Sequence, residues 1–135
     1  MTNENPEKAD GPGPDRFAFS AFIDALPDAV IIVGRDGLIV EINMKAVGLF
    51  GYARDELVGE PVGTLIPDRF RNRHLELQER YNRSPHVRPM GPGTTLYARH
   101  KDGHDIPVAI HLGPYQSADG PLVIGTIRLL SQVPN

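Results

Sequence analysis

Cysteine is absent from this chain of 135 residues. Its absence excludes disulfide scaffolds, thiolate zinc sites, cysteine nucleophiles and flavin photochemistry that proceeds through a cysteinyl adduct. No stretch approaches the roughly 18 consecutive apolar residues of a membrane-spanning helix, so we expect no membrane contact. The first residues, MTNENPEKADGPGPD, also lack the apolar core of a signal peptide. Together these absences predict a cytoplasmic protein.

A surplus of basic residues is missing as well. The formal net charge is −3, so the overall charge gives no attraction to nucleic acid or to anionic lipid. Hydrophobic residues make up 40% of the chain and charged residues 23%, which is the composition of a globular domain with one core. We expect a disordered lead over residues 1–14, one domain over residues 15–131 and a short tail over residues 132–135.

Motifs that carry catalysis are also missing. The chain contains serine, histidine and aspartate, but no G-x-S-x-G, P-loop, H-E-x-x-H or carboxylate pair that would indicate a reaction. His100 and His104 are four positions apart, but they lie across a predicted hairpin turn and not on one face of a helix. The sequence therefore predicts neither an enzyme nor a metal site at these two histidines.

The patterns that are present predict an α+β fold. Residues 29–34 and 38–43 are two β-branched runs joined by an Asp-Gly turn, which is typical of a β-hairpin. Asn43 then stands where a helix begins, because its side chain can accept hydrogen bonds from the first helical N–H groups. Apolar spacing predicts further helices over residues 15–26 and 68–82. Three more strands are expected, over residues 94–101, 104–115 and 121–130.

In this order the elements resemble a known family. The segment LPDAVIIVGRDGLIVEINMKAVGLFGYARDELVGEPV resembles the first half of bacterial PAS domains, and RHKDGHDIPVAIHLGPY followed by DGPLVIGTIR resembles the second half. The resemblance covers about residues 20–130. It implies a five-stranded antiparallel sheet with short helices packed across one face. It also implies a sensory role, in which the domain detects a ligand, a cofactor state or a partner and relays the change to an effector in signal transduction.

One departure from the family concerns the end of the domain. PAS domains usually close with Asp-Ile-Thr after the Ile-Arg pair, and that element links the sheet to the effector. Here Leu129, Leu130 and Ser131 follow Ile127-Arg128. The chain is therefore expected to be either one segment of a longer sensor or a sensor that signals through a separate partner, as in two-component systems.

A narrower resemblance concerns haem. RNRHLELQERYNRSPHVRPMG, over residues 71–91, resembles the haem-binding PAS domain of rhizobial oxygen-sensing histidine kinases, with a gap of about two residues. It implies that His86 binds the haem iron, which suits a neutral imidazole. Arg88 would contact a haem propionate, because Pro92 stands where the kinases have an arginine. His100 would align near a distal arginine, where it would either receive a bound gas or ligate the iron itself. Apolar walls would come from Ile110, Leu112, Ile124 and Ile127.

Three interpretations of the pocket stay open from the sequence: a bound haem, another small ligand, or no tightly held cofactor. In the last case the domain would be an interaction module that forms a homodimer through its N-terminal helix and one face of the sheet. Phe19 and Phe22 are the apolar residues of that helix that we expect in such a dimer. His74 is expected to be a surface or packing residue, and His111 to face away from the pocket.

Overall fold

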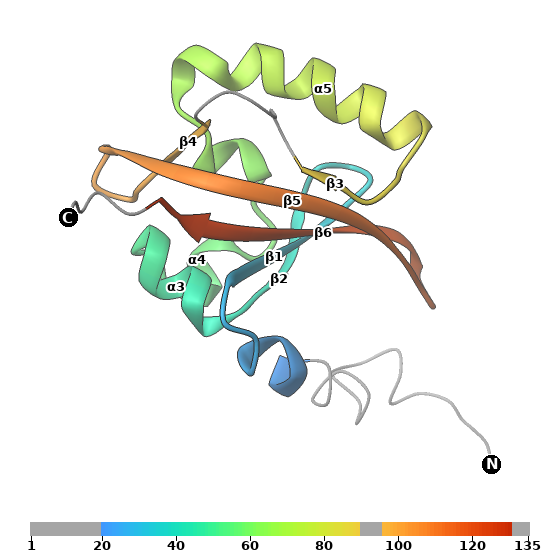
Figure 1. The fold of residues 1–135 in the computed structure, drawn as a ribbon, viewed down its shortest axis with the longest axis horizontal. Coiled ribbons are helices and arrows are strands. Elements are labelled where there is room, and N and C mark those ends of the chain that lie inside the picture. The colour runs from blue at the N-terminus through green and yellow to red at the C-terminus, as the bar shows by residue number, and fades with distance from the viewer. Residues whose placement is uncertain (1–19, 90–95, 131–135) are drawn as a thin grey trace.

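The computed structural model describes residues 20–89 and 96–130 of the chain (Figure 1). The expected lead over residues 1–14 and the tail over residues 132–135 lie outside the described residues, as does Phe19. The expected N-terminal helix over residues 15–26 is described from residue 20, and it is helical over residues 20–24, with Ala25 and Leu26 in the turn that follows. No helix in the described part of the chain is long and apolar enough to cross a membrane.

A single antiparallel sheet forms the centre of the domain (Figure 1). Its strands lie in the order β2-β1-β6-β5-β3, and β4 also pairs with β5. The PAS fold expected from the sequence is therefore confirmed, with one strand more than expected. Two strands share the edge of the sheet beside β5, because β5 pairs with β4 near its start and with β3 further along. The strands are β1 (Ala29–Gly34), β2 (Ile39–Ile42), β3 (Arg88–Pro89), β4 (Leu96–Arg99), β5 (Asp105–Ser117) and β6 (Gly120–Leu129).

Short helices between β2 and β3 cover one face of this sheet, which we call the inner face. The longest of them, α5, runs along the sheet on one side of the domain, and α3 and α4 lie near β1 and β2 (Figure 1). Helix 20–24 packs instead on the opposite, outer face, where Ile23 contacts Val30 and Ile32. The elements are α3 (Met44–Phe50), α4 (Arg54–Leu57), the 3₁₀ helices η1 (Val62–Leu65) and η2 (Asp68–Phe70), and α5 (Arg71–Arg83).

Asn43 joins three of these elements. Its Oδ1 accepts hydrogen bonds from the N–H groups of Ala46 and Val30, at 3.0 and 2.9 Å. Its Nδ2 donates to the carbonyl oxygens of Ile23 and Asp28, at 2.7 and 3.0 Å. The side chain is 1% exposed, so none of these groups can turn to water instead. The predicted N-cap is confirmed, and the same amide also links β1 to helix 20–24.

Glu41, which is buried within the described part of the chain, ties β2 to α4. Both of its carboxylate oxygens accept from the Arg54 guanidinium, at 2.6 and 2.7 Å, and one also accepts from the Ser20 hydroxyl. Burial raises the pKa of the Glu41 carboxyl, but the hydrogen bonds from Arg54 and from the Ile42 N–H outweigh burial and hold the pKa below its usual range. Glu41 therefore stays charged, and its hydrogen bond with Ser20 links it to helix 20–24.

Candidate functional site

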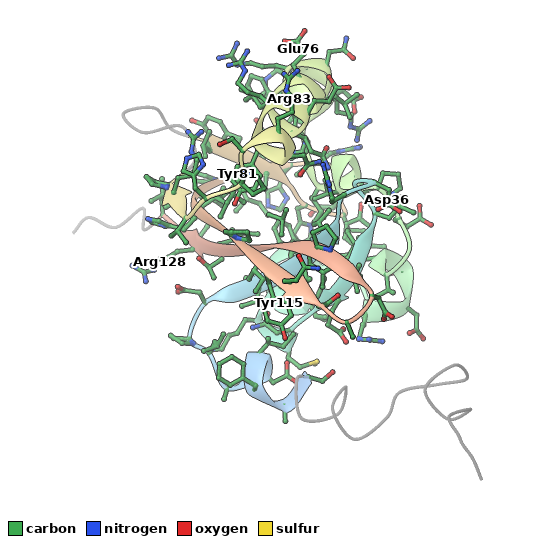
Figure 2. All side chains as sticks on the ribbon, turned by 90° about the vertical axis from the view of Figure 1, so that its right-hand side faces the viewer. Asp36, Glu76, Tyr81, Arg83, Tyr115 and Arg128 are labelled. Carbon is green, nitrogen blue, oxygen red and sulfur yellow. The ribbon has the colours of Figure 1, made fainter. Side chains whose placement is uncertain are left out.

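A cavity of about 410 Å³ lies between α5 and the inner face of the sheet. This volume is within the range of small-molecule and cofactor sites. Figure 2 shows Tyr81 pointing from α5 toward the sheet, whereas Glu76 and Arg83 lie on the outer side of the helix. The walls combine apolar side chains of the sheet with polar side chains of α5 and of the segment that follows it. The cavity is the candidate ligand site.

The sheet wall follows the two-residue period of its strands. Ile110 and Leu112 of β5 line the cavity, and Gly125 and Ile127 of β6 lie opposite them in register. A Cβ added at Gly125 would lie 3.6 Å from the nearest atom, a Leu112 methyl carbon, so the missing side chain adds room at the wall. The part of the wall formed by these four residues of β5 and β6 is therefore apolar and carries no charged side chain.

Ile124 does not belong to this wall, and that prediction is corrected. It packs with Val30 and Ile32 on the outer face of the sheet. Successive side chains of a strand point to opposite faces, so Ile124 and Ile127 of β6 cannot both face inward without a bulge. The register of β6 with β5 is unbroken, and Ile127 is the inward residue of the two.

The helix wall is formed mainly by His74, Leu77, Gln78 and Tyr81 of α5, and Arg80 and Asn82 of the same helix also line the cavity. The first four of these positions have the i, i+3, i+4, i+7 spacing of one helix face. The sequence interpretation placed His74 on the surface or in packing and overlooked Gln78. The signal was present, because this stripe alternates with the charged residues Arg73, Glu76 and Glu79.

His86 lies at the mouth of the cavity, in the segment between α5 and β3. Its Nδ1 is 2.7 Å from the Ser84 carbonyl oxygen, which can only accept, so Nδ1 donates this bond and in the neutral imidazole the lone pair is on Nε2. The imidazole stacks on the Tyr81 ring with 5.8 Å between centroids. The Tyr81 hydroxyl also donates to the His86 carbonyl oxygen at 2.7 Å. Tyr81 thus holds both the ring and the backbone of His86.

Arg88 lies beside His86 and also lines the cavity. It belongs to β3, whose pairing with Leu112 and His111 of β5 fixes its backbone. Its Nε donates to the Pro89 carbonyl oxygen at 3.0 Å. Arg80, from α5, is a second basic residue on the lining. The cavity mouth therefore carries positive charge next to an imidazole.

His100 is not among the residues that line the cavity, and its expected position there is corrected. It lies just past the end of β4, over the end of α3. A Cβ added at Gly51 would come within 2.5 Å of its Cε1. Its ring stacks on His104 with 4.6 Å between centroids. The resemblance to haem-binding PAS domains placed His100 near their distal arginine, but here His100 lies at the β4–β5 turn, away from the cavity.

Burial of His74 in the helix wall predicts a pH-dependent stability. Burial lowers the pKa of His74 below its usual range, because the imidazolium loses water contacts there. The unfolded chain therefore takes up a proton before the folded one does as the pH falls below about 6.5. We expect the free energy of unfolding to fall between about pH 7.5 and pH 5, and the fall to be smaller in His74→Gln.

Urea unfolding followed by far-UV circular dichroism at several pH values measures this effect. The matched control is His111→Gln, because His111 is exposed on the outer face of the sheet. It should leave the pH dependence of the wild type unchanged. An equal pH dependence in His74→Gln and the wild type would contradict the assignment.

Comparisons with known proteins agree with this architecture. The family model described as PAS fold matches residues 18–130. The sensor protein FixL of Bradyrhizobium diazoefficiens is 30% identical over 114 residues, which cover 83% of this chain. The chain spans only 22% of the length of that protein.

Solved structures show the same fold at lower identity. A PAS domain from Colwellia psychrerythraea has a TM-score of 0.72 at 18% identity, covering 87% of this chain and 98% of that one. A PAS domain of a two-component sensor histidine kinase has a TM-score of 0.66 at 14% identity, covering 84% and 96%. PAS domains are sensory modules, and they occur in histidine kinases. The chain belongs to the PAS fold family.

Proposed function

We propose that this PAS domain senses a small ligand through a haem held in the cavity by His86, and relays the state of that haem to a signalling effector. The observation that carries the proposal is the geometry of His86. Its Nδ1 donates to the Ser84 carbonyl oxygen, as the second nitrogen of an iron- or zinc-binding histidine commonly does. Nε2 is therefore the nitrogen that would bind iron.

The other lining residues fit the same group. A porphyrin needs apolar surroundings, which Ile110, Leu112 and Ile127 provide. Its propionates need cations, and Arg88 and Arg80 lie on the same lining. Bound haem would supply an iron centre that can bind a diatomic gas. The resemblance of residues 71–91 to haem-binding PAS domains supports the same choice.

The sheet is the proposed route from the cavity to the effector. Ile31 of β1 and Ile127 of β6 line the cavity on the inner face. Val30 and Ile32, the neighbours of Ile31 in β1, pack against Ile23 of helix 20–24 on the outer face. A shift of the wall strands would therefore move the N-terminal helix directly. We propose that the effector, whether part of a longer chain or a separate protein, reads the position of this helix.

Haem reconstitution tests the proposal. Purified protein incubated with haem should gain an intense absorption band near the violet edge of the visible spectrum. His86→Ala should weaken haem binding by about tenfold or more, because the axial bond is lost. His111→Ala is the matched control and should bind as the wild type does, since His111 is exposed on the outer face. Equal haem affinity in His86→Ala and the wild type would overturn the axial role of His86.

A second candidate function is a cofactor-free module that forms a homodimer through helix 20–24 and the outer face. Phe22 and Met44 favour it, because they are 63% and 62% exposed. They belong to touching segments, since the Met44 N–H donates to Asp24 at 2.8 Å. Protein that stays colourless after reconstitution, yet sediments as a dimer, would favour this candidate over the haem sensor.

A further inference from the structure

The turn between β4 and β5 brings together three side chains that can bind a metal. One ring nitrogen each of His100 and His104 and one carboxylate oxygen of Asp102 lie within 4.8 Å of one another. The sequence predicted no metal site at these histidines, because they lie across a hairpin turn and not on one face of a helix. That argument left out the pairing of the two strands, which brings residues on either side of a turn together. In fact the His100 N–H donates to the His104 carbonyl oxygen at 2.9 Å, so the two residues face each other across the hairpin.

The spacing of the three groups suits a tetrahedral ion. Zinc binds histidine nitrogen and carboxylate oxygen at about 2.0–2.2 Å, which puts two ligands of one ion roughly 3.3 Å apart. Nδ1 of His100 is 3.2 Å from Oδ1 of Asp102. Nδ1 of His104 contacts the same oxygen, and the two rings stack at an angle of 18°. Small rotations of the three side chains would let all of them meet at one point.

Contacts within the turn hold the ligand atoms close together. The Asp102 N–H donates to Nδ1 of His100 at 3.1 Å, and Nδ1 of His104 contacts the Asp102 carboxylate. A metal ion would replace these contacts, and because histidine binds metals in its neutral form, metal binding weakens as the pH falls.

The turn is held in place before any metal arrives. The Lys101 N–H donates to the Phe50 carbonyl oxygen at 2.9 Å, and the Lys101 ammonium pairs with Glu56 at 2.8 Å. The His100 ring packs on Gly51, whose φ is +83°. The side chains of Asp102 and His104 are 62% and 59% exposed, so water can complete the coordination of an ion. The site is thus anchored on one side and open on the other.

We propose that His100, Asp102 and His104 form a binding site for a divalent transition-metal ion of the zinc type. Two imidazoles and one carboxylate favour zinc, nickel or copper over magnesium and calcium, which prefer all-oxygen ligands. The site lies outside the ligand cavity and shares no residue with it. It does not depend on haem.

Calorimetric titration of untagged, haem-free protein with Zn²⁺ tests the proposal. We expect one ion per chain at pH 7.5, tighter than Mg²⁺, with an affinity that falls at pH 5.5 and a release of protons seen as a dependence on buffer ionisation heat. The variants His100→Ala, His104→Ala and Asp102→Asn should each lose about tenfold or more in affinity. His111→Ala and His86→Ala should bind Zn²⁺ as the wild type does.

A wild-type affinity no stronger than that of a His100→Ala/His104→Ala double variant would overturn the site. Loss of zinc binding in His86→Ala or His111→Ala, with the turn intact, would place the ion elsewhere and overturn it too. Thermal unfolding gives a second readout. Zn²⁺ should raise the midpoint of the wild type and leave that of the double variant unchanged, because only a folded turn brings the ligands together.

Discussion

Replacing Asn43 with alanine should lower the free energy of unfolding by about 3 kcal/mol. The substitution removes a helix N-cap, which typically contributes about 1 kcal/mol. It also leaves the buried Val30 N–H and the Ile23 and Asp28 carbonyl oxygens without the amide that satisfies them. Each buried polar group left unpaired costs roughly 1–3 kcal/mol. The chain has no tryptophan, so urea unfolding is best followed by far-UV circular dichroism.

Two further variants separate the roles of this amide. Asn72→Ala is the matched control, because Asn72 is exposed on α5, and its effect should stay within about 0.5 kcal/mol. Asn43→Asp keeps both acceptor bonds but loses both donor bonds, so it should be less stable than the wild type. A loss below about 1 kcal/mol in Asn43→Ala would mean that the amide acts only as a helix cap.

Most of the fold could be predicted because local patterns and tertiary pairing agree. The Asp-Gly turn between β1 and β2 shows this. The Leu38 N–H donates to the Asp36 side chain at 3.0 Å, and Gly37 has a φ of +85°, as the dipeptide implies. The strand β3 could not be predicted, since it has only two residues and exists through its pairing with β5. A proline-rich segment of that kind carries no strand pattern of its own.

The candidate site was predictable where it depends on one element and less so where it depends on several. Five of the seven expected residues line the cavity: His86, Arg88, Ile110, Leu112 and Ile127. Ile124 was misplaced because apolar residues occur on both faces of β6, which is covered on both sides. His100 was misplaced because its position depends on where α3 ends, at Gly51. The two-residue period of a strand already separates Ile124 from Ile127, but which of the two faces inward depends on tertiary packing. The position of His100 likewise cannot be read from the residues around it.

Phe50→Ala should cause the largest loss of stability, about 4 kcal/mol. Phe50 is 1% exposed and packs at the end of α3 in the main core. Deleting its ring removes the free energy of burial and leaves a void that the rigid strands around it cannot close. Phe22→Ala deletes the same ring at a site that is 63% exposed, so this control should change the free energy of unfolding of the monomer by less than about 1 kcal/mol. Similar losses for both variants, measured by urea unfolding, would contradict the packing argument.

Phe50 also lines the ligand cavity, so the same variant connects stability with ligand binding. Haem at about 100 times its dissociation constant should restore about 2.7 kcal/mol, because a ligand that binds only the folded state stabilises it by RT ln(1 + [L]/Kd). At the same haem concentration, a tenfold weaker affinity should cut the restoration to about 1.4 kcal/mol or less in Phe50→Ala/His86→Ala, although the loss of stability without haem remains. Equal restoration in the single and the double variant would show that haem is held without His86. No restoration in either would mean that the ring of Phe50 is needed to shape the cavity and not only to fill the core.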